Sequence, residues 1–258
     1  MYRWIPLMPH LLDLPVRASL TAGHARFARQ RGRVLRYAPD LAALAALPDR
    51  PEPEDWADAA VLAGPGGVLH LVGQDPELPA GWLTVSHVRG VQLVLRRPVT
   101  TYDDEVRELS SVDIPEMAAL VRATRPGPLH PGSFRCTAYF GVRRHGTLIA
   151  VGGLRMRPAG HTEISTVCTL PEYRRRGLAR RLVGHLSSVV VDQGNTPFLH
   201  AEVGQEVIPR LYGSLGFEPR SDLSLRKIAA PVGGPRLPSR RAGTGYIPPV
   251  PRQRGPSD

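Results

Sequence analysis

The protein has 258 residues, a length that suits one large or two small domains and allows a substantial core. With 42% hydrophobic and 22% charged residues, the composition excludes a chain that is disordered throughout. The net charge of +10 favours anionic ligands or partners but says nothing about the fold.

The only two cysteines, Cys136 and Cys168, form no CxxC pair. This argues against structural zinc and disulfides and for a reducing compartment, and no metal site is expected. The N-terminal sequence MYRWIPLMPHLLDLP lacks an apolar stretch followed by a cleavage site, and no run of eighteen apolar residues occurs. We therefore expect a soluble cytoplasmic protein without a membrane partner.

Residues 1–100 predict a small α/β domain whose role the sequence does not reveal. Its expected parts, in order, are two helices, a proline-rich acidic loop and two short strands, at 19–32, 41–47, 48–58, 66–73 and 91–97. Pro98 and the following TTYDDE interrupt the periodicity. We place a domain boundary there, with a second domain at 101–230.

The second domain predicts alternating helices and strands. In chain order these are a helix at 112–123, a hairpin turning at His145-Gly146, a strand at 162–170, a helix from Leu178, a strand at 197–203, a short helix at 207–217 and a final edge strand. A strand, loop, helix and strand in succession imply two parallel neighbouring strands joined by a crossover helix.

The stretch EYRRRGLARRLVGHL (172–186) places five arginines around one glycine at the start of a helix. A loop between a strand and a helix presents unpaired N–H groups and the positive end of the helix dipole. Gly177 lets the backbone approach an anion, and Ala179 leaves that space open. We interpret the stretch as a seat for a cofactor pyrophosphate. The alternatives are a solvated helix start and a nucleic-acid patch, which would need aromatic residues beyond Tyr173.

Arg174 to Ala179 (RRRGLA) resembles the R/Q-x-x-G-x-G/A signature of the GNAT superfamily of N-acyltransferases, and LYGSLGF (211–217) resembles a second element of that family. The resemblance covers about 103–228. It implies an α/β fold with a mixed central sheet of GNAT type and flanking helices. TRPGPL (124–129) and LTAGHARFA further resemble glycine N-acyltransferase-like proteins, a subgroup with an extra N-terminal domain.

The resemblance implies transfer of an acetyl group from acetyl-CoA to a primary amine of a small molecule or peptide by direct attack. Backbone N–H groups before the motif would hold the pantetheine, and those of the motif would hold the pyrophosphate. The expected cofactor-binding residues are Val167, Thr169, Arg174, Arg175, Arg176, Gly177, Leu178, Ala179 and Arg180. Tyr212 matches the position whose hydroxyl protonates the departing thiolate.

The general base stays open at this point. Glu163 and Glu202 both lie on strands beside the expected cleft, with Glu163 preferred, and a water relay would need neither. Cys168 would be the nucleophile of a ping-pong enzyme, but structural burial is the expectation. Gln205 stands where many relatives have Asn, and Pro209 is compatible with the Tyr212 assignment if it lies in the first helical turn.

Two other functions stay open: a non-catalytic acyl-CoA-binding protein, and a nucleic-acid-associated protein that uses its basic tail, with nucleic acid disfavoured. The tail at 231–258 is rich in proline, glycine and arginine and is expected to be disordered. Arg125, in the loop after the 112–123 helix, is expected to contact the acceptor. The sequence does not reveal the oligomeric state.

Overall fold

A computed structural model describes residues 10–98, 100–124, 129–204 and 207–233. Arg125, Gln205 and the tail from residue 234 lie outside these residues. The helices are α1 (Pro15–Leu20), α2 (Pro53–Ala63), α3 (Ile114–Thr124), α4 (Leu178–Asp192) and α5 (Val207–Gly213). The strands are β1 (Ala28–Arg31), β2 (Val34–Tyr37), β3 (Leu44–Ala46), β4 (Val68–Val72), β5 (Leu83–Leu95), β6 (Val106–Leu109), β7 (Ala138–Arg144), β8 (Thr147–Leu154), β9 (His161–Thr169), β10 (Thr196–Glu202) and β11 (Phe217–Ala229).

All the described strands belong to one mixed sheet in the order β1-β2-β3-β4-β11-β5-β10-β9-β8-β7-β6. β9 and β10 are parallel neighbours joined through α4, as the sequence predicted. β7 and β8 form the predicted hairpin, in which His145 and Gly146 both have positive φ, the conformation that a tight hairpin turn requires. The predicted mixed sheet is therefore confirmed.

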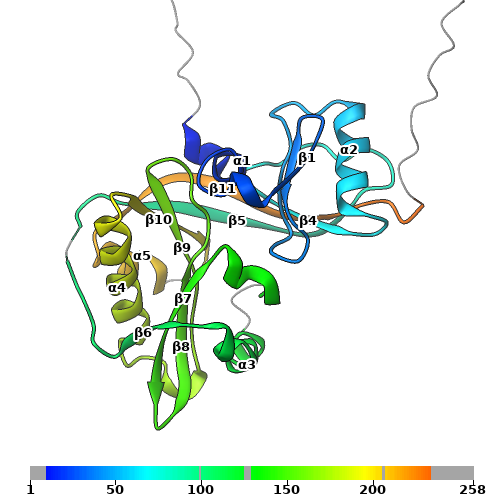
Figure 1. Ribbon diagram of the computed structural model, residues 1–258. Coiled ribbons are helices and arrows are strands. Elements are labelled where there is room, and N and C mark those ends of the chain that lie inside the picture. Colours follow the sequence, from blue (N-terminus) through cyan, green and yellow to red (C-terminus); the bar gives the residue numbers. More distant parts are fainter. Residues whose placement is uncertain (1–9, 99, 125–128, 205–206, 234–258) are drawn as a thin grey trace, which may run out of the picture.

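The long strands β5 and β11 join the two halves of the molecule (Figure 1). β5 precedes residue 100, yet it lies between β10 and β11. β11 pairs with β5 over most of its length and with β4 at its end. The division at residue 100 stays a prediction, and the sheet runs across it. The expectation that the last strand lies at an edge is wrong, because strands from the N-terminal part flank it on both sides.

Helices cover both faces of the C-terminal part of the sheet (Figure 1). Buried residues of α4, including Leu182 and Leu186, pack against Ile149 and Ile164 of the sheet. α3 packs on the other face, with Met117 in a separate cluster. Because α4 carries a continuous apolar stripe, its burial against the strands fixes where its N-terminus lies relative to β9.

Three predictions in the N-terminal part are wrong. Residues 19–32 form the end of α1, turns and β1, and 41–47 contain β3. All three residues of β3 are buried, and a short apolar run buried on both faces has no strand periodicity to distinguish it from a helix. The expected loop at 48–58 ends at residue 52, because α2 begins at Pro53, and Glu52 and Asp55 form a capping box.

Candidate active site

The parallel strands β9 and β10 separate soon after they meet. They pair only from His161 with Thr196 to Glu163 with Phe198, and β10 then continues along β5. In β9, Thr166 has a φ of 57°, and the register against β8 shifts in the same region. A bulge of this kind bends a strand, so the edge of β9 beyond Glu163 is left open.

The open edge of β9 presents backbone donors. The N–H of Leu170 donates to the carbonyl of Ile149 on β8 (2.9 Å). Alternate residues of a strand direct their backbone groups to opposite edges, so the N–H groups of Val167 and Thr169 face away from β8. The hydroxyl of Thr169 is buried and has no hydrogen-bond partner within the described part of the chain.

The loop before α4 is a second group of donors. Arg175 and Gly177 have φ values of 60° and 78°, and the first helical hydrogen bond runs from the N–H of Arg181 to the carbonyl of Gly177 (3.0 Å). Among described residues, the backbone N–H groups from Arg175 to Arg180 have no hydrogen-bond partner. A Cβ added at Gly177 would meet no atom within 4 Å. This loop therefore combines open space, free donors and the positive end of a 15-residue helix.

The arginine side chains of this region differ in their contacts. Arg174 donates to the carbonyl of Thr169 (3.2 Å), and Arg176 donates to the carbonyl of Glu172 (3.0 Å) and lies over the ring of Tyr173.

Arg181 is held by Asp103 and Glu105, whereas Arg180 donates to the hydroxyl of Ser214 (2.5 Å). Arg175 is exposed and forms no side-chain hydrogen bond with the described residues. Some of these arginine side chains therefore hold the local structure, whereas Arg175 is available to bind an anion.

Tyr212 lies on α5, and its half-buried ring packs against the α4 side of the core. It meets the ring of Phe217 edge-on at 6.0 Å between centroids. Burial raises the pKa of its hydroxyl, which therefore stays protonated at neutral pH. Pro209 is the third residue of α5, within the first turn, so it does not break the helix.

Glu163 lies in a buried ion pair. Arg155 donates two hydrogen bonds to its carboxylate, from Nε and Nη2, both 2.7 Å. Nδ1 of His200 lies 2.9 Å from the same carboxylate. Burial alone would raise the pKa of Glu163, but the charge and hydrogen bonds of Arg155 and the contact with His200 hold it below its usual range. Glu163 is therefore an anion with little tendency to accept a proton.

The other residues considered from sequence differ in environment. Glu202 ends β10 and is exposed. Cys168 is buried as expected, and burial raises the pKa of its thiol to about 11, which disfavours a thiolate nucleophile.

A small pocket beside β9, lined by both polar and apolar side chains, was not anticipated from the sequence. Its lining includes Tyr37, His70, His130, Tyr139, Arg155 and Thr166. Burial lowers the pKa of His70 to about 4, so that imidazole is neutral at pH 7. The pocket assembles residues from both halves of the chain, and an isolated histidine or tyrosine carries no sequence signal for such an arrangement. Thr166, at the bulge, links the pocket to the open edge of β9.

Among the described residues, no helix is long and apolar enough to cross a membrane, and no cluster of three or more candidate metal ligands occurs.

Comparison with known proteins identifies the family to which the chain belongs. Residues 139–225 match the family model described as FR47-like protein. A solved structure from Novosphingobium aromaticivorans, named "Putative Acetyltransferase from the GNAT family", is 35% identical and has a TM-score of 0.78 over 86% of this chain and 99% of that chain. The protein belongs to the GNAT family of acetyltransferases.

More distant matches agree in fold. The GCN5-related N-acetyltransferase from Kribbella flavida has a TM-score of 0.56 at 20% identity over 84% of this chain and 95% of that chain, a likeness of fold alone.

Two curated relatives match over shorter regions. A Bacillus subtilis "Putative acetyltransferase" is 36% identical over 29% of this chain and 50% of its own length. An uncharacterized protein of Mycobacterium leprae is 31% identical over 52% of this chain and 42% of its own. The chain therefore spans about half the length of the curated relatives that it matches.

Proposed function

We propose that the protein is an N-acetyltransferase that uses acetyl-CoA to acetylate a small primary amine by direct attack. The observation that carries the proposal is the run of unpartnered N–H groups from Arg175 to Arg180, set beside an open strand edge. Backbone donors at a helix N-terminus bind phosphate oxygens through hydrogen bonds and the helix dipole. Gly177 leaves room for a pyrophosphate to approach them.

The open edge of β9 provides donors for the rest of acetyl-CoA. In this proposal the pyrophosphate lies on the loop, near Arg175 and Arg180, and the pantetheine lies along β9, where Val167 and Thr169 direct their N–H groups outward. When bound, acetyl-CoA supplies an activated thioester carbonyl. A backbone N–H directed at that oxygen would stabilise the negative charge that develops there.

The small pocket beside Thr166 is the proposed acceptor site. Its small size favours a small amine over the surface of a folded protein. An amine must be uncharged to attack, and a pocket that contains the guanidinium of Arg155 and the neutral imidazole of His70 disfavours an ammonium ion. We infer that the amine loses its proton to water on entry.

Tyr212 is the proposed general acid. A phenol whose pKa is raised by burial keeps its proton at neutral pH and can transfer it to a departing thiolate.

Glu163 has a different role in this proposal. Its carboxylate is occupied by Arg155, so it positions that guanidinium at the pocket instead of removing a proton from the amine.

A second candidate is an acyl-CoA-binding protein without catalysis. It keeps the donor loop but does not need Tyr212. Replacing Tyr212 by Phe separates the two, because loss of turnover with unchanged acetyl-CoA affinity requires an enzyme.

The decisive experiment is calorimetric titration of acetyl-CoA into the wild-type protein and the variant Gly177→Glu. A carboxylate at residue 177 would enter the open space and repel the pyrophosphate, so binding should be lost in the variant. Arg181→Ala is the matched control, since Asp103 and Glu105 already hold that side chain. Absence of binding to the folded wild-type protein would refute the proposal.

A further inference from the structure

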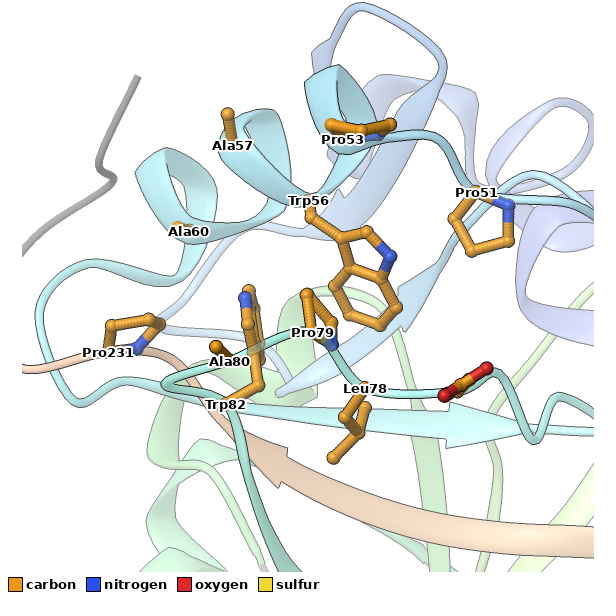
Figure 2. A pocket seen from close by; sticks show the side chains of 11 residues that line it. Pro51, Pro53, Trp56, Ala57, Ala60, Leu78, Pro79, Ala80, Trp82 and Pro231 are labelled. Carbon is orange, nitrogen blue, oxygen red and sulfur yellow. The ribbon is translucent and has the colours of Figure 1, made fainter. Parts of the chain in front are cut away.

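The N-terminal part contains an apolar groove of about 530 Å³ that the proposed reaction does not use (Figure 2). Its lining includes Pro51, Trp56, Leu78, Pro79, Trp82 and Pro231. The rings of Trp56 and Trp82 meet edge-on, with centroids 5.1 Å apart. Trp56 comes from α2, Trp82 immediately precedes β5, and Pro231 follows β11. The groove therefore lies between α2, the loop before β5 and the residues after β11. It is distinct from the β9 edge and the donor loop.

The groove is open to solvent, and Val232, the residue after the lining residue Pro231, is 82% exposed. Exposed apolar surface of this kind marks an interaction site. Glu77 adds an exposed carboxylate to the lining, and it forms no ion pair within the described residues. A fitting ligand would thus combine apolar groups with a positive charge.

The protein's own C-terminal sequence has this chemistry. Residues 246–251 read YIPPVP, and Arg252 and Arg254 follow directly. Proline-rich segments bind grooves lined by aromatic residues, because a polyproline II helix is already extended and loses little entropy on binding. We propose that the groove binds residues 246–251 of the same chain, with the arginines that follow lying near Glu77.

The connection is long enough for this. Pro231 lines the groove, and twelve residues separate Gly233 from Tyr246. A random-coil chain of that length would have a root-mean-square span of about 20 Å. A segment of six residues in polyproline II covers about 19 Å. Tethering over such distances gives an effective concentration of about 1 mM, so an intrinsic Kd of about 100 µM would leave the groove about 90% occupied.

The chain's other end carries a related sequence, WIPLMP, at residues 4–9. Both segments consist of an aromatic residue, Ile, Pro, two apolar residues and Pro. The C-terminal segment is the better fit for two reasons. Its connection begins at the groove itself, and two arginines follow it that can pair with Glu77, whereas the N-terminal segment has one flanking arginine, Arg3.

The test uses the full-length protein and a labelled peptide of residues 244–254. One protein carries the wild-type tail, and the other carries Tyr246→Ser, Pro248→Gly and Pro251→Gly, which disrupt the segment without touching the described structure. The peptide should bind the substituted protein, and the wild-type protein should bind it about 10-fold more weakly, because its own tail competes.

In the substituted protein, Glu77→Lys should weaken peptide binding about 3-fold, as expected for one exposed charge pair. Glu54→Lys, an equally exposed change on α2 outside the groove lining, should not.

Three results would overturn the proposal. Equal binding of the peptide to both proteins would mean that the tail does not occupy the groove, and absence of binding to either would exclude the segment as a ligand. A difference between the two proteins that disappears on dilution would show that the tail of a second copy, not the chain's own tail, competes.

Replacing Trp4 by Phe leaves Trp56 and Trp82 as the only tryptophans. Their emission should then change when the peptide binds, which places it at the groove.

Discussion

Arg155 and Glu163 join β8 and β9 through two hydrogen bonds of 2.7 Å at the place where β9 and β10 begin to separate. The side chain of Glu163 is 1% exposed and that of Arg155 is 34% exposed, so the ion pair lies at the boundary between the sheet interior and the small pocket beside β9. Its geometry supports a role in holding the pocket, and this role can be distinguished from proton transfer.

Replacing Glu163 by Gln should destabilise the protein by about 2–3 kcal/mol, because it leaves the guanidinium of Arg155 without its counter-charge at a largely buried position. Urea denaturation measures this loss. The double variant Glu163→Leu, Arg155→Met should be more stable than either single variant, since an apolar pair has no unpaired charge. If Glu163 also acted as the base, the Gln variant would in addition lose the acidic limb of the plot of kcat/KM against pH.

The sequence predicted the C-terminal elements well because each carries its own local signal: a hairpin turn at His145-Gly146, an apolar stripe on α4, and glycine at residue 177. It did not predict β5 between β10 and β11, because the neighbours of a strand depend on tertiary packing. The pocket was missed for the same reason. Tyr37 and Arg155 lie 118 residues apart in the sequence, and neither sits in a pattern that requires the other.

The arginines of the donor loop should differ in their effect on cofactor affinity. Arg175→Ala should weaken acetyl-CoA binding about 2- to 5-fold, the effect of one exposed charge, and added salt should reduce the difference. Arg181→Ala should leave affinity unchanged, because Asp103 and Glu105 already neutralise that guanidinium. Calorimetry at two salt concentrations measures both. Equal losses in the two variants would show that the cluster acts only through its total charge.

Tyr212→Phe should lower kcat by about 10²- to 10⁴-fold, the usual contribution of a positioned proton donor, with acetyl-CoA affinity unchanged. Phe retains the ring that packs against Phe217, so thermal stability should stay near the wild-type value. Steady-state kinetics with an accepted amine, combined with calorimetry, makes the comparison. A variant with wild-type kcat would remove Tyr212 from the mechanism.

His24 should make the protein less stable in mild acid. It is 3% exposed, its Nδ1 lies 2.9 Å from the hydroxyl of Tyr37, and burial, helped by Arg157, lowers its pKa to about 4. Between pH 6.5 and 4 the unfolded chain binds a proton that the folded protein does not bind. The free energy of unfolding therefore falls as the pH drops, by on the order of 3 kcal/mol for this residue.

The variant His24→Asn is less stable at pH 7 but lacks that proton. The pH dependence of its urea midpoint between pH 7 and 5 should be shallower than that of the wild type. Parallel slopes would mean that His24 titrates normally in the folded protein.

Gly177→Ala separates backbone strain from cofactor binding. The φ of 78° at Gly177 is unfavourable for alanine by about 1 kcal/mol, although its Cβ would meet no atom. Gly194, after α4, has a φ of 74° and the same open surroundings, so Gly194→Ala should cost a similar amount of stability. Only Gly177→Ala should weaken acetyl-CoA binding, because its methyl group enters the space proposed for the pyrophosphate. Loss of affinity in both variants would attribute the effect to strain at the ends of α4 instead of to a phosphate seat at Gly177.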